Sequence, residues 1–152
     1  MTLQDFPLTI DFLNSYGEFI VEQMKSKLLQ AGKDATGKLI NSIRYQISFQ
    51  GGFPVISFSM ADYGIFVEEG RKAGGKQPPI SAITPWLSIK GIPREAAFPI
   101  ARKIAKEGIP PTPFFNSTFQ QYKSQFTQGY EQALETDISI WAVSQINNRN
   151  LL

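Results

Sequence analysis

The chain has 152 residues, 42% hydrophobic and 18% charged, a balance typical of one globular domain. It contains no cysteine and no histidine, which excludes disulfides, thiolate or imidazole metal ligands, and Ser-His or Cys-His nucleophile pairs. The net charge is only +2, so strong nonspecific nucleic-acid binding is not implied, and a basic surface would have to come from local clustering.

The first long element predicted is a helix that starts near residue 9 and ends before Gly32. Thr9 or Asp11 is expected to cap it. The preceding residues lack a basic segment followed by an apolar run, so no secretory signal is expected. No apolar run approaches the roughly twenty residues that a membrane helix needs. Apolar residues recur at intervals of three and four, which defines one helix face: Ile10, Leu13, Tyr16, Ile20, Met24 and Leu28.

An antiparallel hairpin is predicted next, because polarity alternates with a period of two in residues 39–49 and again in residues 53–60. The run Gln50-Gly51-Gly52 suits the tight connection between the two strands. The apolar faces consist of Ile43, Tyr45, Ile47 and Phe49 in the first strand and Ile56, Phe58 and Met60 in the second.

The stretch from Tyr63 to Ile92 has the most particular order of residue types in the chain. Asp62 is expected to cap a short helix that runs through Glu69 and ends at Gly70. Tyr63, Phe66 and Val67 would share one face of that helix. A basic glycine loop, residues 71–77, and the pair Pro78-Pro79 follow. A second short helix is expected to have Thr84 as its cap, Pro85 in its first turn, and Trp86, Leu87 and Ile89 as its apolar anchor.

Two further helices are predicted, one between Pro93 and Gly108 and one from Phe114 to about Asn147. Pro99 favours either a kink in the first of these helices or a later start near Phe98. Asn116 or Ser117 is expected to cap the last helix, in which Gly129 costs about 1 kcal/mol relative to alanine. Residues 148–152 are expected to fray. A helix of some thirty residues spans about 45 Å, more than this domain needs to cover, so part of its apolar stripe is expected to pack on a neighbour.

Three carboxylates, Asp62, Glu68 and Glu69, are the candidates for acid–base chemistry. Adjacent carboxylates on a helix point in different directions, and no histidine stands near them. Catalysis, a metal and a cofactor are therefore not expected. Asp62 is better explained as a cap, and the two glutamates as partners of Arg71 or of a neighbouring subunit.

The basic loop leaves three interpretations open. Arg71, Lys72 and Lys76 could contact phosphates, or they could keep an exposed loop solvated, which is the favoured interpretation. The loop could also become ordered only against another copy of the protein. For Trp86, a place in the core is favoured over a ligand platform.

A series of short motifs follows in a fixed order from residue 63 to residue 114: Tyr63, Phe66-Val67-Glu68, Gly70-Arg71, Pro78-Pro79, Ile83, Trp86, Lys90-Gly91-Ile92, Ile100-Ala101, Ile104, Gly108 and Thr112-Pro113-Phe114. The segment Thr36-Gly37-x-Leu39-x-x-Ser42-Ile43 precedes them at the entry to the first strand. This order resembles that of the tail-completion, or head–tail joining, proteins of tailed bacteriophages, and the resemblance covers residues 9 to about 135. Thr112 stands where an arginine is common in that family, and the last helix is longer than usual.

The resemblance implies an α+β fold, here a single domain over residues 1–152. A small antiparallel sheet would be packed by a long N-terminal helix, short central helices and a long C-terminal helix. It also implies a virion structural protein, made in the bacterial host cytoplasm, that forms a homo-oligomeric ring in the phage neck or upper tail and joins the portal to the tail. Other neck, portal-adaptor or tail proteins would be its partners, without catalysis or cofactor.

In such rings the variable loop is ordered by an adjacent subunit or ring. The implied interface loop consists of Gly70, Arg71, Lys72, Gly74, Gly75, Lys76 and Gln77. The interface or anchor candidates are Tyr63, Phe66, Glu68, Glu69 and Trp86.

Two alternatives to this reading stay open. The first is a nucleic-acid-contacting or packaging-associated module that touches DNA in a channel, motivated by Arg71, Lys72 and Lys76 and by the group at Arg102, Lys103 and Lys106. The second is an enzyme that acts through Asp62, Glu68 and Glu69.

Overall fold

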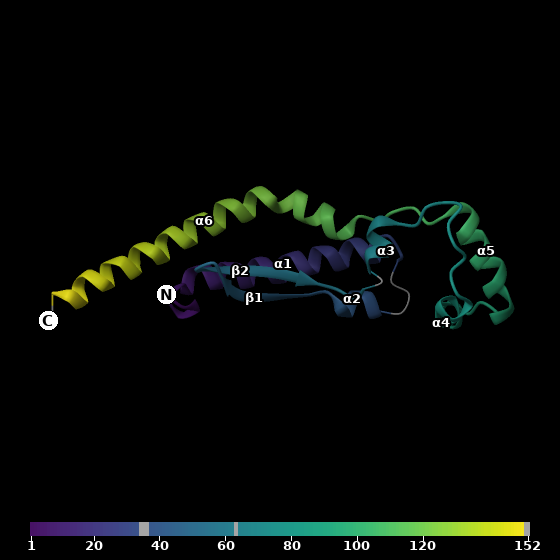
Figure 1. Ribbon diagram of the computed structural model, residues 1–152, viewed down its shortest axis with the longest axis horizontal. Helices are drawn as coiled ribbons and strands as arrows, with labels where there is room; N and C mark the ends of the chain where they lie inside the picture. The colour runs from purple at the N-terminus through teal and green to yellow at the C-terminus, as the bar shows by residue number, and fades with distance from the viewer. Residues whose placement is uncertain (34–36, 63, 151–152) are drawn as a thin grey trace. The chain divides into compact units, whose positions relative to one another are not determined.

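The computed structural model describes residues 1–33, 37–62 and 64–150, and it combines helices with one antiparallel hairpin (Figure 1). The α+β prediction is therefore confirmed. In chain order the elements are a 3-10 turn at Leu3–Asp5, α1 (Pro7–Gln30), α2 (Lys38–Ser42), β1 (Arg44–Gln50), β2 (Phe53–Ser59), α3 (Gly64–Glu69), α4 (Ile80–Lys90), a 3-10 turn at Arg94–Ala96, α5 (Ala97–Glu107) and α6 (Phe114–Arg149).

The chain divides into two compact units, each assembled from segments distant in sequence. The first unit contains Met1–Gln23, Arg44–Ser59 and Thr118–Leu152. The second contains Met24–Ile43 and Met60–Ser117. Helices α1 and α6 each contribute to both units. That the whole chain is one domain stays a prediction.

The hairpin of the first unit confirms the predicted connection. Strands β1 and β2 pair antiparallel, with Tyr45 opposite Phe58 and Ile47 opposite Ile56. Gly51 and Gly52 form the two-residue loop with φ values of 60° and 87°. A type I′ turn needs positive φ at both positions, and its twist matches that of the strands, which is why two glycines stand here.

Aromatic side chains from three distant segments pack together in the first unit. The ring centroid of Phe126 on α6 lies 4.8 Å from that of Tyr16 and 6.0 Å from that of Phe12, both on α1. Phe119 lies 5.1 Å from Phe58 of β2. Such pairs add roughly 0.5–1.5 kcal/mol beyond the area they bury. The apolar stripe predicted for α6 is thus used as core over these turns.

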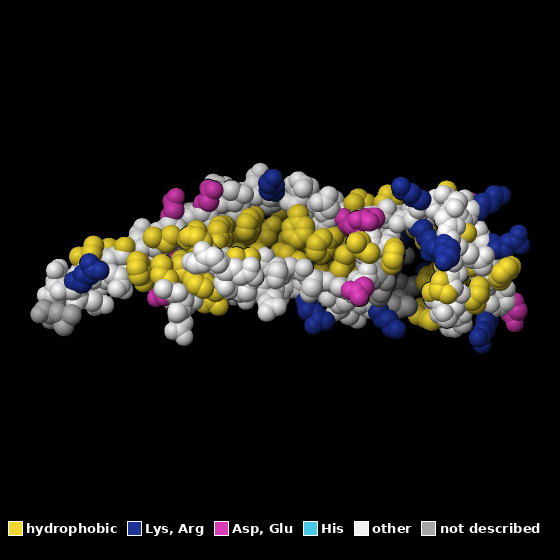
Figure 2. All heavy atoms as spheres, in the orientation of Figure 1, with side chains coloured by type: hydrophobic (Ala, Val, Ile, Leu, Met, Phe, Trp, Pro, Cys, Tyr) yellow, Lys and Arg dark blue, Asp and Glu magenta, His cyan; other side chains and the backbone are white. Residues whose placement is uncertain are grey.

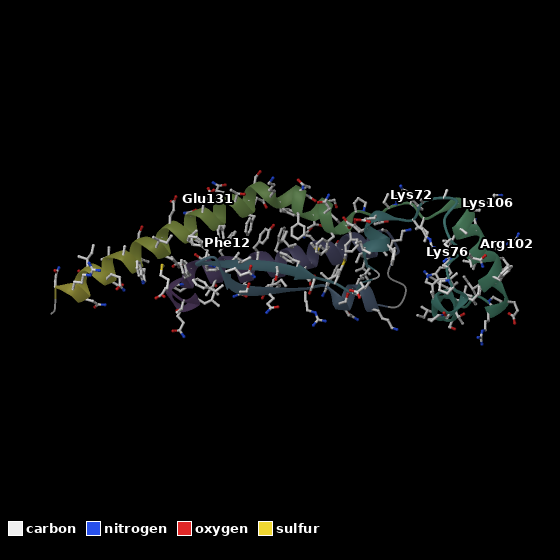
Figure 3. All side chains as sticks on the ribbon, in the orientation of Figure 1. Phe12, Lys72, Lys76, Arg102, Lys106 and Glu131 are labelled. Atoms are coloured by element: carbon white, nitrogen blue, oxygen red, sulfur yellow. The ribbon has the colours of Figure 1, made fainter. Side chains whose placement is uncertain are left out.

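Gly129 has a packing role in α6 that helix propensity does not show. A Cβ atom at this position would overlap the ring of Phe12. Figure 3 shows Phe12 between α1 and α6, with Glu131 on the outer side of α6. Glycine here lowers helix stability by about 1 kcal/mol relative to alanine, but it leaves the space that the Phe12 ring occupies.

Helix α1 begins at Pro7, earlier than predicted, and neither Thr9 nor Asp11 caps it. The cap comes from α6. The carboxylate of Asp137 accepts hydrogen bonds from the backbone N–H of Leu8 at 3.2 Å and of Thr9 at 2.7 Å, and from the Thr9 hydroxyl at 2.7 Å. Proline suits the first helical position because its missing N–H would have no helical partner there. The buried carboxylate is stabilised by these donors and by the helix dipole.

The other end of α1 is as predicted. Gly32 has φ 64°, and its N–H donates to Leu29 O at 3.1 Å, while the N–H of Lys33 donates to Leu28 O at 3.2 Å. This pair of bonds is a Schellman motif, which glycine permits without strain.

Residues 38–42 of the second unit form a helical turn, α2, and not the start of a strand as predicted. The Ser42 hydroxyl donates to Leu39 O at 2.7 Å and accepts from the Ala61 N–H at 2.9 Å. Leu39 and Ile43 are both buried. Their separation of four residues suits a helical turn as well as a strand, so alternation alone could not decide between them.

Helix α4 begins at Ile80, about one turn before the predicted start at Thr84 and Pro85. Ile83 and Leu87 are its buried residues, and they form a small core with Ala97 and Ala101 of α5. Burial of this face outweighs the one backbone hydrogen bond that Pro85 cannot make within the helix.

The anchor predicted for α4 is only partly right. Leu87 is buried, whereas Trp86 is 39% exposed and Ile89 is 52% exposed. The favoured placement of Trp86 in the core is therefore wrong for the isolated chain. The prediction for α5 is confirmed, because it starts at Ala97, with Pro99 in the first turn, where no helical N–H partner is lost.

Helix α6 continues to Arg149, beyond the predicted end near Asn147. The last two residues of the tail predicted to fray, 151 and 152, lie outside the described residues. Among the helices that the structure describes, none is long and apolar enough to cross a membrane.

Candidate functional site

Glu68, a candidate interface residue, caps α6 instead of pairing with Arg71. Its carboxylate accepts hydrogen bonds from the backbone N–H of Phe115 at 2.7 Å and of Asn116 at 2.8 Å. The predicted caps, Asn116 and Ser117, do not perform this role. The N–H groups of a first helical turn lack helical partners, so a carboxylate from a neighbouring element satisfies them well. Both oxygens of Glu68 are occupied by this contact.

The basic loop is paired with the chain itself at its first residues. The N–H of Arg71 donates to Ile109 O and the N–H of Ile109 donates to Arg71 O, both at 2.8 Å. The N–H of Gly74 donates to Ala105 O at 2.8 Å. The Arg71 guanidinium donates to the carbonyl of Lys76. These bonds hold the loop against the end of α5 and the connector after it.

Gly70 and Gly108 permit this pairing. Their φ values are 72° and 75°. A Cβ atom on Gly70 would lie 2.5 Å from Ile109 O, and one on Gly108 would overlap the backbone of Arg71 and Lys72. Backbone atoms cannot move aside as a side-chain tip can, so both positions require glycine.

The structure brings together the two basic groups that are separate in sequence. Gly74, Gly75 and Gln77 of the loop line one open hollow with three basic residues of α5, Arg102, Lys103 and Lys106. Figure 2 shows Lys and Arg side chains gathered over this part of the chain, and Figure 3 labels Lys72 and Lys76 beside α5. Lys72, Lys76 and the three α5 cations are exposed.

The net charge of +2 conceals a strong difference between the units. The second unit carries twelve Lys or Arg and six Asp or Glu, a side-chain charge of +6. The first carries three Lys or Arg and seven Asp or Glu, a charge of −4. Composition alone predicted that a basic effect would need local clustering, and the second unit contains such a cluster.

The aromatic candidates differ in their surroundings. Phe66 is 64% exposed and Ile65 beside it is 48% exposed, so α3 presents an apolar surface. Phe98 is 55% exposed, and the Arg102 guanidinium carbon lies 5.8 Å from its ring centroid. Tyr63, a further anchor candidate, lies outside the described residues.

The end of α6 is apolar and exposed on more than one side. Ile138, Ile140, Val143 and Ile146 are 37–60% exposed. From residue 137 to residue 150 the only ionisable side chains are Asp137, which is buried, and Arg149. A helix that is apolar on several sides is normally covered.

The three candidate acids have different surroundings. Glu68 is occupied as a cap, and Asp62 and Glu69 are exposed. Among the described residues, no cluster of three or more Asp or Glu could hold a metal ion.

No protein-family model, curated protein or solved structure matches the chain.

Sequence reasoning identified the loop and the basic residues of α5, but not that they share one surface, because the bonds joining them are backbone bonds that any residue type could make. It also missed the capping role of Asp137. A signal was present, since this carboxylate interrupts the apolar stripe between Leu134 and Trp141. An acid on a buried stripe needs donors, and an open helix N-terminus supplies them.

Proposed function

We propose that the protein is a virion structural subunit that assembles with copies of itself into a ring in the neck or upper tail of a tailed bacteriophage and joins head to tail. The order of motifs from Tyr63 to Phe114 motivates the family part of this proposal. The observation that carries assembly is the exposed apolar segment 138–146 of α6, which contains no ionisable side chain. The proposed function includes no catalysis and no cofactor.

The apolar end of α6 supports self-association on energetic grounds. Complete burial of an Ile or Val side chain contributes about 1.5–3 kcal/mol. Ile140, Val143 and Ile146 each expose more than half of their surface. Covering them would therefore contribute on the order of 1 kcal/mol each, and the absence of like charges here removes electrostatic repulsion between copies.

A ring requires that two different surfaces of the subunit meet. The exposed pair Ile65 and Phe66 on α3 provides a second apolar surface, in the other unit. Phe66 is one of the anchor candidates of the sequence. The proposed contact places the α6 end of one copy on an apolar surface of the next.

The test is the native mass of the purified protein, measured by light scattering after gel filtration or by native mass spectrometry. The double variant Ile140→Lys/Val143→Lys is expected to lower the mass from that of an oligomer to that of a monomer. The control, Ser124→Lys/Gln128→Lys, adds the same charge to exposed polar positions of α6 and is expected to keep the oligomer. A monomeric unmodified protein at about 100 µM would contradict self-assembly.

A second measurement addresses the neck itself. A phage that carries the Ile140→Lys/Val143→Lys variant is expected to accumulate separate heads and tails in negative-stain micrographs. Normal joined particles, or a protein absent from purified virions, would show that the neck assignment is wrong even if the isolated protein forms a ring.

A further inference from the structure

The most strongly charged surface of the chain lies on residues 70–108. This segment holds eight Lys or Arg and two Asp or Glu. Lys103 pairs with Glu107 at 4.0 Å, but the two side chains are 72% and 58% exposed. Exposed pairs of this kind contribute little free energy. The cations therefore retain most of their attraction for an external anion.

The surface is held in place by the fold. The bond from Gly74 N to Ala105 O places the loop beside α5, and the paired Arg71 and Ile109 fix the start of the loop. Arg102 and Lys106 are separated by one helical turn, so their side chains emerge on one face of α5. Arg102, Lys103 and Lys106 thus line an open hollow together with Gly74, Gly75 and Gln77 of the loop that carries Lys72 and Lys76.

We propose that this surface, defined as Lys72, Lys76, Arg102, Lys103 and Lys106, binds the phosphodiester backbone of nucleic acid without regard to base sequence. A small anion would need buried donors that converge on one point, whereas all five cations are exposed. Several exposed cations spread over two elements suit an extended polyanion. Contacts to phosphate carry no sequence information, so binding should be insensitive to sequence.

This inference does not rest on assembly into a ring. The end of α6 that is proposed to join subunits belongs to the first unit, and the basic surface belongs to the second. Loss of one activity without the other is therefore measurable, through native mass for assembly and nucleic-acid binding for the basic surface.

The experiment measures binding of the full chain to a fluorescein-labelled 30-base-pair DNA duplex of random sequence, by fluorescence anisotropy from 50 to 200 mM NaCl. The logarithm of the binding constant is expected to fall linearly with the logarithm of salt concentration, by about 0.9 for each phosphate neutralised. The variant Arg102→Gln/Lys103→Gln/Lys106→Gln should bind on the order of 10- to 100-fold more weakly at 50 mM, with a slope shallower by up to about 2.7.

The matched control is Lys33→Gln/Lys123→Gln/Arg149→Gln, which removes the same charge from exposed positions outside the surface. Its affinity should stay within about threefold of that of the unmodified protein, because affinity depends on the cations that contact phosphates and not on the total charge of the protein. Both variants should unfold at the unmodified protein's temperature, since their changes are at exposed positions.

Four results would overturn the proposal. These are no binding by the unmodified protein at 50 mM NaCl, full binding by the α5 variant, an equal loss in the control, or tighter binding of poly-glutamate of equal charge than of the duplex. The last result would identify an acidic protein as the partner.

Discussion

The interactions that stabilise the first unit internally differ from those that stabilise the second. In the first, side chains interlock, with Phe126 against Phe12 and Tyr16, and a buried carboxylate, Asp137, that caps α1. In the second, much of the order around the basic loop comes from backbone bonds between residues 71–74 and 105–109, and the capping carboxylate, Glu68, is only partly buried. Side-chain packing leaves a periodic pattern in a sequence, whereas backbone pairing leaves little more than its glycines.

The largest effect is expected from Gly108→Ala in the second unit. Gly108 combines φ 75° with ψ −168°, a conformation that is nearly restricted to glycine. The added methyl group would also overlap the backbone of Arg71 and Lys72. Strain and overlap together should lower the free energy of unfolding by about 4 kcal/mol, measured by urea denaturation.

Gly91→Ala is the matched control for this prediction. Gly91 also has positive φ, at 67°, but a Cβ atom there would meet nothing within 4 Å. Its substitution should cost only about 1 kcal/mol. Equal losses for the two variants would mean that the close backbone contact at Gly108 does not contribute to stability. The second unit would then not depend on backbone pairing, as the comparison of the two units requires.

An intermediate effect is expected from Asp137→Ala in the first unit. The change leaves the N–H groups of Leu8 and Thr9 and the Thr9 hydroxyl without their acceptor in a buried site. The free energy of unfolding should fall by about 3 kcal/mol, because unsatisfied buried donors are costly.

Asp137→Asn keeps one acceptor oxygen and should recover part of the loss. As a control, Asp11→Asn neutralises an exposed acid on α1, the helix that Asp137 caps, and should stay within about 0.5 kcal/mol of the unmodified protein. If Asp137→Ala cost no more than Asp11→Asn, the buried cap would have no energetic importance.

The smallest of the three effects is expected from Glu68→Ala in the second unit. Its two acceptor oxygens serve the N–H groups of Phe115 and Asn116. Water can replace a carboxylate at this partly exposed cap, so the loss should be about 1 kcal/mol, typical of a helix cap. Glu69→Ala, at the exposed neighbouring position, is the control and should be near neutral. A loss as large as that of Asp137→Ala would show that the two caps are equivalent, despite their different burial.

The features of the candidate site that depend on residue type could be predicted from the sequence, whereas those that depend on backbone pairing could not. The loop from Gly70 to Gln77 and the cations of α5 were evident from the sequence, and Gly70 and Gly108 directly follow the ends of α3 and α5, as predicted. Their assembly into one surface was not evident, since the bond between Gly74 N and Ala105 O involves no particular side chain. The exposure of Trp86 was missed for a related reason. Helical spacing identifies a face, but only the packed neighbours determine whether that face is covered.

The sequence by itself determined the hairpin with its glycine turn and the long helices, because these depend on the periods of apolar residues and on local backbone preferences. Tertiary structure alone decided which carboxylate caps which helix, why an aromatic ring lies against Gly129, and that residues 38–42 form a helical turn. These features join residues far apart in the chain. A hydrogen bond across more than a hundred residues, such as that between Thr9 and Asp137, depends on the fold and leaves no fixed spacing in the sequence.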